Sequence, residues 1–298
     1  MVGMLPRDHW VRETWRLDAE RDRRRVVEIL AAHEFPWDNV QALSFALYRT
    51  FAVPSIGRLL AETGEFTGRV QRRYDDTALL LDEILEHGLG HERGRDAVRR
   101  INRMHRSHDI GNDDMRYVLA TFVVVPKRWM DRFGYRRFTL HENDSLVSYY
   151  RELGQHMGIR DLPADFAGFE RLLDDYEREH FAFDPDARRV ADATLDLMTT
   201  FRPFSLLPRA LARRTAYAVM DEPLLRAFRY ARPTLLERAA VVGGMRLRAR
   251  LIARLPARRR PRRTGEFGFV RSYPDGYDIA RLGTFPRCPV GPERSVSG

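Results

Sequence analysis

Apolar residues recur at three- and four-residue steps along most of the chain, which is the spacing of one face of an α-helix. Val70, Tyr74, Leu81 and Ile84 give a clear example, and Gly88 follows them as a helix-ending residue. Alternating apolar and polar runs, which indicate strands, are nearly absent. The pattern therefore predicts an all-α fold built as a single multi-helix domain.

Local signals predict where several helices begin and end. A charged, helix-prone stretch predicts one helix over residues 13–32. The most apolar helix is expected over residues 115–133, bent at Pro126, because proline cannot donate the helical hydrogen bond. Thr139, followed three positions later by Glu142, forms a capping-box pattern that predicts the start of the next helix.

The composition of the chain changes after about residue 235. We expect a helical domain over residues 1–235 and an Arg-rich peripheral tail over residues 236–298. Nine arginines and no acidic residue lie between Arg246 and Arg263, and they account for the whole net charge of +9. The basic character thus belongs to one segment, so it does not support a nucleic-acid-binding protein. The segment is also amphipathic, which predicts peripheral contact with an anionic membrane. The alternatives are that it packs against acidic faces of the domain or that it is a solvated arm.

Several classes of protein are excluded by what the sequence lacks. A single cysteine, Cys288, rules out a disulfide framework, a multi-cysteine zinc site and an iron–sulfur cluster. No apolar run approaches the roughly 18 residues of a membrane span, and no secretory signal is visible at the N-terminus. Nucleotide-binding loops, the serine-hydrolase elbow and the zincin motif are absent. These features predict a cytoplasmic protein, with peripheral membrane contact as the alternative.

Two histidines stand out because they fall on the apolar stripe of a predicted helix over residues 93–109. His105 and His108 share this face with Val98 and Ile101. A buried neutral imidazole costs free energy unless its nitrogens find partners. One interpretation is a satisfied core histidine beside one at the helix end, and the other is an axial ligand of a metal or haem. Glu177 and His180, spaced as in carboxylate-bridged di-iron bundles, lack the second motif that such a site needs.

The preceding helix carries a comparable polar pair on its apolar side. Arg73 and Thr77 are four residues apart, so they lie one above the other. An arginine on the buried side needs an acceptor. It either pairs with Asp75 or Asp76, or it contributes to a polar pocket in which Arg73 stabilises an anion and Thr77 donates a hydrogen bond.

Four segments of the chain resemble the bacterial branch of the MpaB-type oxygenases, a family related to the latex-clearing rubber oxygenases. They are residues 54–66, 72–77, 99–105 and 109–129, which occur in the family's order, and the resemblance extends over about residues 33–230. It implies an all-α fold with a globin-like core around a haem b pocket. By the match to the rubber oxygenases, His105 is the axial iron ligand, and Arg73, Asp76 and Thr77 are the catalytic residues on the opposite side.

Two departures from the rubber oxygenases bear on the substrate. Asp76 stands where they have a lysine, and Asp109 stands where they have an arginine. Acidic groups in place of cationic ones change the field at bound dioxygen, so polyisoprene is not the expected substrate. The resemblance implies a haem-dependent oxygenase that uses dioxygen on a double bond of a lipophilic, isoprenoid-like molecule. The alternative is a non-catalytic helical protein that binds haem or lipid.

Overall fold

The structure is a computed structural model that describes residues 5–283 of the chain. Cys288 and the end of the predicted Arg-rich tail lie outside these residues. The fold is all-α, as predicted: within residues 5–283 the only β-type pairing is an isolated bridge between Leu5 and Ala257. Its helical elements are α1 (His9–Thr14), α2 (Arg23–Glu28), the π-helix η1 (Ile29–Glu34), α3 (Pro36–Thr50), α4 (Pro54–Glu62), α5 (Glu65–Gly68), α6 (Val70–His87), α7 (Glu92–Arg106), α8 (Asn112–Phe133), α9 (Leu140–His156), α10 (Phe166–His180), α11 (Pro185–Met198), the 3-10 helix η2 (Phe204–Leu206), α12 (Arg209–Val219), α13 (Glu222–Ala227), α14 (Leu235–Ala253), and the 3-10 helices η3 (Thr264–Phe267) and η4 (Ile279–Arg281).

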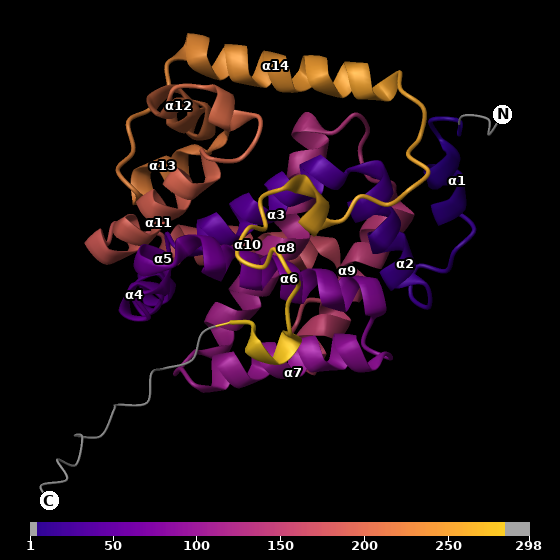
Figure 1. The fold of residues 1–298 in the computed structure, drawn as a ribbon, viewed down its shortest axis with the longest axis horizontal. Coiled ribbons are helices and arrows are strands. Elements are labelled where there is room, and N and C mark those ends of the chain that lie inside the picture. Colours follow the sequence, from indigo (N-terminus) through magenta and orange to yellow (C-terminus); the bar gives the residue numbers. More distant parts are fainter. Residues whose placement is uncertain (1–4, 284–298) are drawn as a thin grey trace, which may run out of the picture.

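Helix α8 lies near the centre of the fold, where it packs against α3, α9 and α10 (Figure 1). It is apolar enough to be buried on several sides, and Tyr117, Val123 and Val124 are fully enclosed. The helix continues through Pro126 to Phe133. The predicted apolar helix is thus confirmed, and so is the Thr139–Glu142 capping box at the start of α9.

The single helix predicted over residues 13–32 is wrong. Helix α1 ends at Thr14, and α2 begins only at Arg23. Between them the Asp18 side chain accepts hydrogen bonds from the backbone N–H groups of Glu20 and Arg21. Such local side-chain bonds offer the backbone an alternative to the helical ladder, which explains why a helix-prone composition does not produce one helix here.

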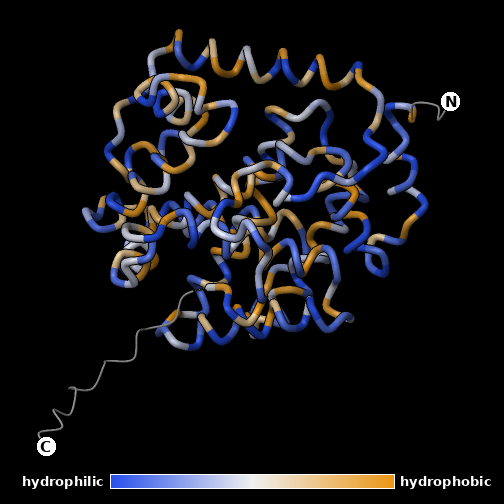
Figure 2. Tube along the Cα trace, in the orientation of Figure 1, coloured by the Kyte–Doolittle hydropathy of each residue, from blue (hydrophilic) through white to orange (hydrophobic). Residues whose placement is uncertain are grey.

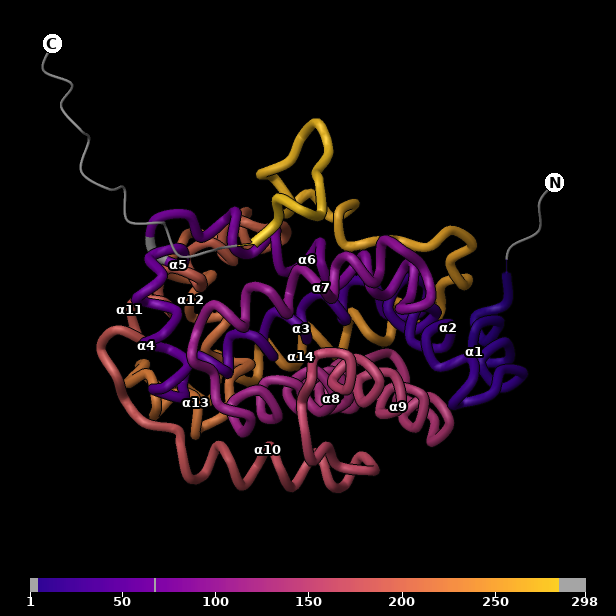
Figure 3. The backbone as a smooth tube through the Cα atoms, turned by 90° about the horizontal axis from the view of Figure 1, so that it is seen from below, coloured from indigo at the N-terminus to yellow at the C-terminus, as the bar shows by residue number. Residues whose placement is uncertain are grey.

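Helices α6 and α7 form an antiparallel pair on one side of α8. Gly88 ends α6 with a positive φ of 73°, and a Cβ on Gly94 at the start of α7 would collide with the Gly88 carbonyl oxygen. The turn can therefore be this tight only with glycine at both positions. Figure 3, which views the fold from below, shows the two helices side by side. Their facing residues Leu80, Ile84, Ala97 and Val98 belong to the main hydrophobic core.

The chain after residue 235 packs against the domain at several points. Helix α14 lies along one edge of the molecule against α12, and hydrophobic and hydrophilic residues alternate along its trace (Figures 1 and 2). The following segment crosses α6 and reaches α7, where η4 packs. Arg248 forms an ion pair with Asp38, and Arg263 forms one with Glu86.

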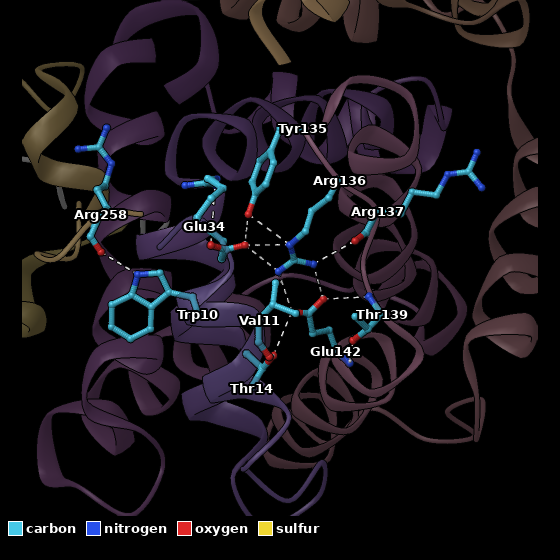
Figure 4. Close-up of polar contacts among 11 residues, drawn as sticks. Trp10, Val11, Thr14, Glu34, Tyr135, Arg136, Arg137, Thr139, Glu142 and Arg258 are labelled. Atoms are coloured by element: carbon cyan, nitrogen blue, oxygen red, sulfur yellow. Dashed lines mark hydrogen bonds and ion pairs between the residues drawn. The ribbon is translucent and has the colours of Figure 1, made fainter. Parts of the chain in front are cut away.

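A buried charge cluster joins the N-terminal helices to the α8–α9 connection (Figure 4). The Arg136 guanidinium donates from Nη1 and Nη2 to the two carboxylate oxygens of Glu142, at 2.7 and 2.8 Å, and from Nε to Glu34 at 2.9 Å. Thr14 of α1 donates to the same Glu142 at 3.2 Å, and Tyr135 donates to Glu34. Each buried charge in this cluster has a partner of opposite sign within hydrogen-bond distance.

Candidate functional site

A cavity of about 250 Å³ lies between α3, α4, α6, α7 and α8. Its walls are mainly apolar, with Leu59, Leu81, Met115 and Val118 among them. Polar side chains enter it from a few positions only, and these include Arg73, Thr77, His105, His108, Asp109 and Asp114. Three of the four predicted site residues, from two different helices, thus border one cavity.

Arg73 and Thr77 enter the cavity from α6. The Arg73 Nη1 donates to the Thr77 hydroxyl at 2.7 Å, and that hydroxyl donates to the Arg73 carbonyl oxygen at 3.1 Å. The guanidinium lies 5.4 Å from the ring centre of Phe66. Among residues 5–283 no carboxylate forms an ion pair with Arg73, so the pairing with Asp75 or Asp76 considered above is not found. Burial lowers the pKa of Arg73, while the charges of Asp76 and Glu65 oppose that shift.

His105 lies on α7, one residue before that helix ends. Its Nδ1 atom is buried and has no hydrogen-bond partner among the described residues. Burial, with smaller contributions from Arg73 and His108, lowers the pKa of His105 to about 4. The imidazole is therefore neutral near pH 7, the form in which histidine binds metals. Arg73 and Thr77 of α6 and His105 of α7 therefore bring their polar groups to the same cavity.

Asp76 does not border the cavity. Its carboxylate is buried on another side of α6, where Tyr273 of the C-terminal segment donates a hydrogen bond to it. The successive residues Asp76 and Thr77 point in different directions because neighbours in a helix are about 100° apart. The charge of Asp76 nevertheless favours the protonated form of Arg73.

His108 and Asp109 also border the cavity, but they lie beyond the end of α7, in the turn before α8. Among the four aromatic residues of α8, Phe122 lines the cavity, whereas Tyr117, Trp129 and Phe133 are core residues. Glu177 is paired with Arg49 in the interior.

Sequence reasoning missed Asp114 as a cavity residue. Its position in the first turn of α8 indicates a capping role, yet its carboxylate accepts hydrogen bonds from Ser55 at 3.1 Å and from Tyr176 at 2.6 Å. These partners lie 59 and 62 positions away in the sequence, so no local signal identifies them.

The sequence matches a family model described as the ER-bound oxygenase mpaB/B′ and rubber oxygenase catalytic domain, over residues 39–255. The matched region contains α6, α7 and the whole cavity. This chain belongs to that oxygenase family. The resemblance seen in the four sequence segments is thus confirmed, and the protein is a member of a family of oxidoreductases that act with dioxygen.

Three curated members of the MpaB/rubber-oxygenase family are similar to the chain. ER-bound oxygenase mpaB′ of Penicillium brevicompactum is 30% identical over 69% of this chain and 52% of its own length. ER-bound oxygenase mpaB of the same fungus is 30% identical over 58% of this chain and 49% of its own length. The mpaB oxygenase of Penicillium roqueforti is 28% identical over 74% of this chain and 79% of its own length. The chain therefore spans about half the length of the first two relatives. Within the described part of the chain, no helix combines the length and hydrophobicity needed to cross a bilayer.

Proposed function

We propose that this protein is a haem b oxygenase that uses dioxygen to oxidise or cleave a double bond in a lipophilic, isoprenoid-like substrate. One observation carries the proposal. In a member of an oxygenase family, a neutral histidine and an arginine without a carboxylate partner among the described residues border the same largely apolar cavity. His105 would hold the haem iron, and Arg73, supported by Thr77 and Asp76, would stabilise charge in the cavity.

The residues around the cavity suit a haem group. A neutral imidazole with one buried nitrogen unsatisfied is a suitable iron ligand, and apolar walls suit a porphyrin plane. Bound haem would supply the iron that binds and activates dioxygen.

The protein's own side chains would position the reactants and set the electrostatic field. Arg73 keeps a positive charge and N–H donors beside the cavity, where they can stabilise negative charge that develops on oxygen. Thr77 holds the guanidinium in place, and Asp76 supports its protonated form from behind α6. The apolar walls exclude water and hold a hydrocarbon chain.

Arg73→Ala and Thr77→Ala test this division of roles. We expect both variants to retain their haem but to lose much of their turnover, because neither residue would bind iron. Dioxygen consumption with an unsaturated lipid, against its saturated analogue, measures turnover. Haem binding without dioxygen consumption would instead favour the non-catalytic haem- or lipid-binding protein. Unchanged turnover in both variants would refute the role of the α6 pair.

We further propose that the protein is cytoplasmic and meets its substrate at an anionic membrane surface, which α14 contacts. The outward side of α14 exposes Leu236, Leu247 and Leu251, together with Arg246 and Arg250. Apolar side chains flanked by arginines are typical of helices that lie in a membrane interface. Arg248 and Arg263 form ion pairs with the domain, whereas Arg246 and Arg250 form none with a described residue.

Sedimentation with liposomes tests this contact. The double variant Leu247→Ser/Leu251→Ser should lose binding to anionic vesicles, while Leu211→Ser, which changes an exposed leucine of α12, should retain it. Added salt should weaken the binding of the wild type. Equal sedimentation of all three proteins, or no effect of salt, would exclude α14 as the electrostatic anchor.

A further inference from the structure

A second cavity, of about 90 Å³, adjoins the cavity at His105. We call it the inner cavity. Both are bordered by Leu47, Thr77, Leu81, Phe122 and Leu153, so one layer of side chains separates them. The other walls of the inner cavity come from α3, α6, α8, α9 and neighbouring elements, and they are mostly aliphatic and aromatic. Such a space, next to the reactive site, suits a hydrocarbon chain.

A wider cleft of about 340 Å³ lies beyond the inner cavity, between α3 and the residues around positions 200 and 268. It shares Val40, Ser44, Tyr74 and Phe269 with the inner cavity. The hydroxyl groups of Ser44 and Tyr74 are 2.6 Å apart and form a hydrogen bond at this boundary. The cleft, the inner cavity and the His105 cavity therefore lie in series, with single layers of side chains between them.

The charges that line the cleft have one sign. Arg202 and Arg271 border it, and the described residues that line it include no aspartate or glutamate. Among the described residues, the Arg271 guanidinium donates to neutral acceptors, namely the Thr200 hydroxyl and carbonyl, both at 3.0 Å, and the Gly268 carbonyl at 3.3 Å. Arg202 forms no ion pair with a described residue, and its side chain is exposed. Two arginines without acidic partners, beside aromatic rings, favour an anionic group.

The segment from Thr264 to Arg271 covers the inner cavity, and we call it the strap. Two hydrogen bonds join Thr264 to Asp82. The Thr264 hydroxyl donates to the Asp82 carboxylate at 2.6 Å, and the Thr264 backbone N–H donates to it at 3.1 Å. The backbone N–H of Arg271 donates to Asp75 at 3.0 Å. Both ends of the strap are thus fixed to α6, and Phe269 in its middle separates the cleft from the inner cavity.

We propose that the cleft and the inner cavity together bind an amphiphile with an anionic head group, a carboxylate or a phosphate, and an apolar tail. The head lies at Arg202 and Arg271. The tail passes under the strap where Ser44 and Tyr74 separate, fills the inner cavity and ends beside Thr77, next to the His105 cavity. This inference rests on the proposed function, because it supplies the substrate class for that reaction.

Binding of saturated ligands tests the inference without any turnover. Dodecanoate, dodecyl phosphate and the neutral dodecanol share one tail and differ in the head group. We expect the wild type, as purified, to bind one or both anions about tenfold more tightly than dodecanol, as measured by calorimetry, since a bond to a charged group contributes about that much. The preferred anion identifies the head group. Equal binding of all three ligands would overturn the proposal.

Two pairs of variants locate the head and the tail. Arg202→Gln should remove most of the preference for the anion and leave dodecanol binding unchanged, whereas Arg226→Gln, at an exposed arginine outside the three cavities, should change neither. Leu43→Trp should fill the inner cavity and weaken all ligands at least about tenfold. Leu197→Trp is the matched control, because Leu197 is partly buried and borders none of the three cavities.

The outcomes separate this inference from the proposed function. Identical ligand affinities of Arg202→Gln and Arg226→Gln would rule out the proposed head site. Both residues are on the surface, so this comparison does not depend on whether the core tolerates a tryptophan. Identical ligand affinities of Leu43→Trp and Leu197→Trp would rule out the proposed tail site. Absence of haem or of dioxygen consumption, with the binding pattern intact, would refute the oxygenase reaction but not the amphiphile site.

Discussion

Two arginines in the interior of this protein have very different surroundings. Arg136 is bonded to Glu34 and Glu142, so its charge is neutralised on two sides (Figure 4). Among the described residues, the Arg73 guanidinium contacts the hydroxyl of Thr77 and the ring of Phe66, and it borders a cavity. A buried charge is costly unless it is paired. The difference shows that Arg136 serves the fold, while Arg73 remains available to a ligand.

Asp82 extends the comparison to a negative charge. It borders the inner cavity and forms no ion pair with a described residue; its hydrogen bonds come from Thr264. Burial raises the pKa of Asp82 to about 6. Arg73 and Asp82, which form no ion pair with a described residue, therefore both lie beside a cavity. The following changes test the difference between these charges and the paired Arg136, in order of the expected effect on stability.

Arg136→Met should give the largest loss of stability. It leaves Glu34 and Glu142 buried without their cation, and breaking such a pair costs about 3–5 kcal/mol. Urea denaturation followed by circular dichroism measures the loss. A change under about 1 kcal/mol would mean that this cluster does not hold the N-terminal helices in place.

Asp82 should make stability depend on pH. The pKa of Asp82 is about 6 in the folded protein, whereas its ordinary value, expected in the unfolded chain, is 3.8. As pH rises, the unfolded chain therefore loses this proton before the folded protein does. The free energy of unfolding therefore falls by up to about 3 kcal/mol between about pH 4 and pH 6. Asp82→Asn carries no charge at either pH and should flatten this slope. Identical slopes for both proteins in urea titrations would contradict the assignment.

Arg73→Met should change the free energy of unfolding by less than about 1 kcal/mol, because no carboxylate loses a partner. Its turnover should nevertheless fall at least about tenfold, as expected when one charged donor is removed from a reaction site. The same denaturation assay and the dioxygen assay provide the two values. A loss of stability comparable to that of Arg136→Met would show that Arg73 is structural.

Arg178→Ala should have the smallest effect. Arg178 pairs with Asp175 on the surface of α10, where the two side chains are 73% and 66% exposed. Exposed pairs of this kind contribute about 0.5 kcal/mol or less. The variant therefore sets the background against which the other three are judged, and raising the salt concentration should abolish even this contribution.

Much of the fold follows from the sequence, because helical periodicity and capping residues are local signals. The apolar pattern of α8 and the capping box of α9 are examples that the structure confirms. The break after Thr14 was not predictable from helix propensity, since it depends on hydrogen bonds at Asp18 that compete with the helix.

The candidate site, like the fold, is predictable from the sequence only where the signal is local. Spacing on single helices placed Arg73 and Thr77 together, and an apolar face singled out His105. The position of Asp76 behind α6 depends on Tyr273, almost 200 residues further along the chain. The strap, the inner cavity and the role of Asp114 likewise arise from contacts between distant segments. Contacts between distant segments can be identified only in a three-dimensional structure.

The absorption spectrum of the purified protein tests the central claim most directly. We predict a Soret band from one haem per chain in the wild type, its retention in His108→Ala and its loss in His105→Ala. His108 is the matched control because it borders the same cavity three residues away. A wild-type protein that binds no haem, or a spectrum lost in His108→Ala and kept in His105→Ala, would contradict the account.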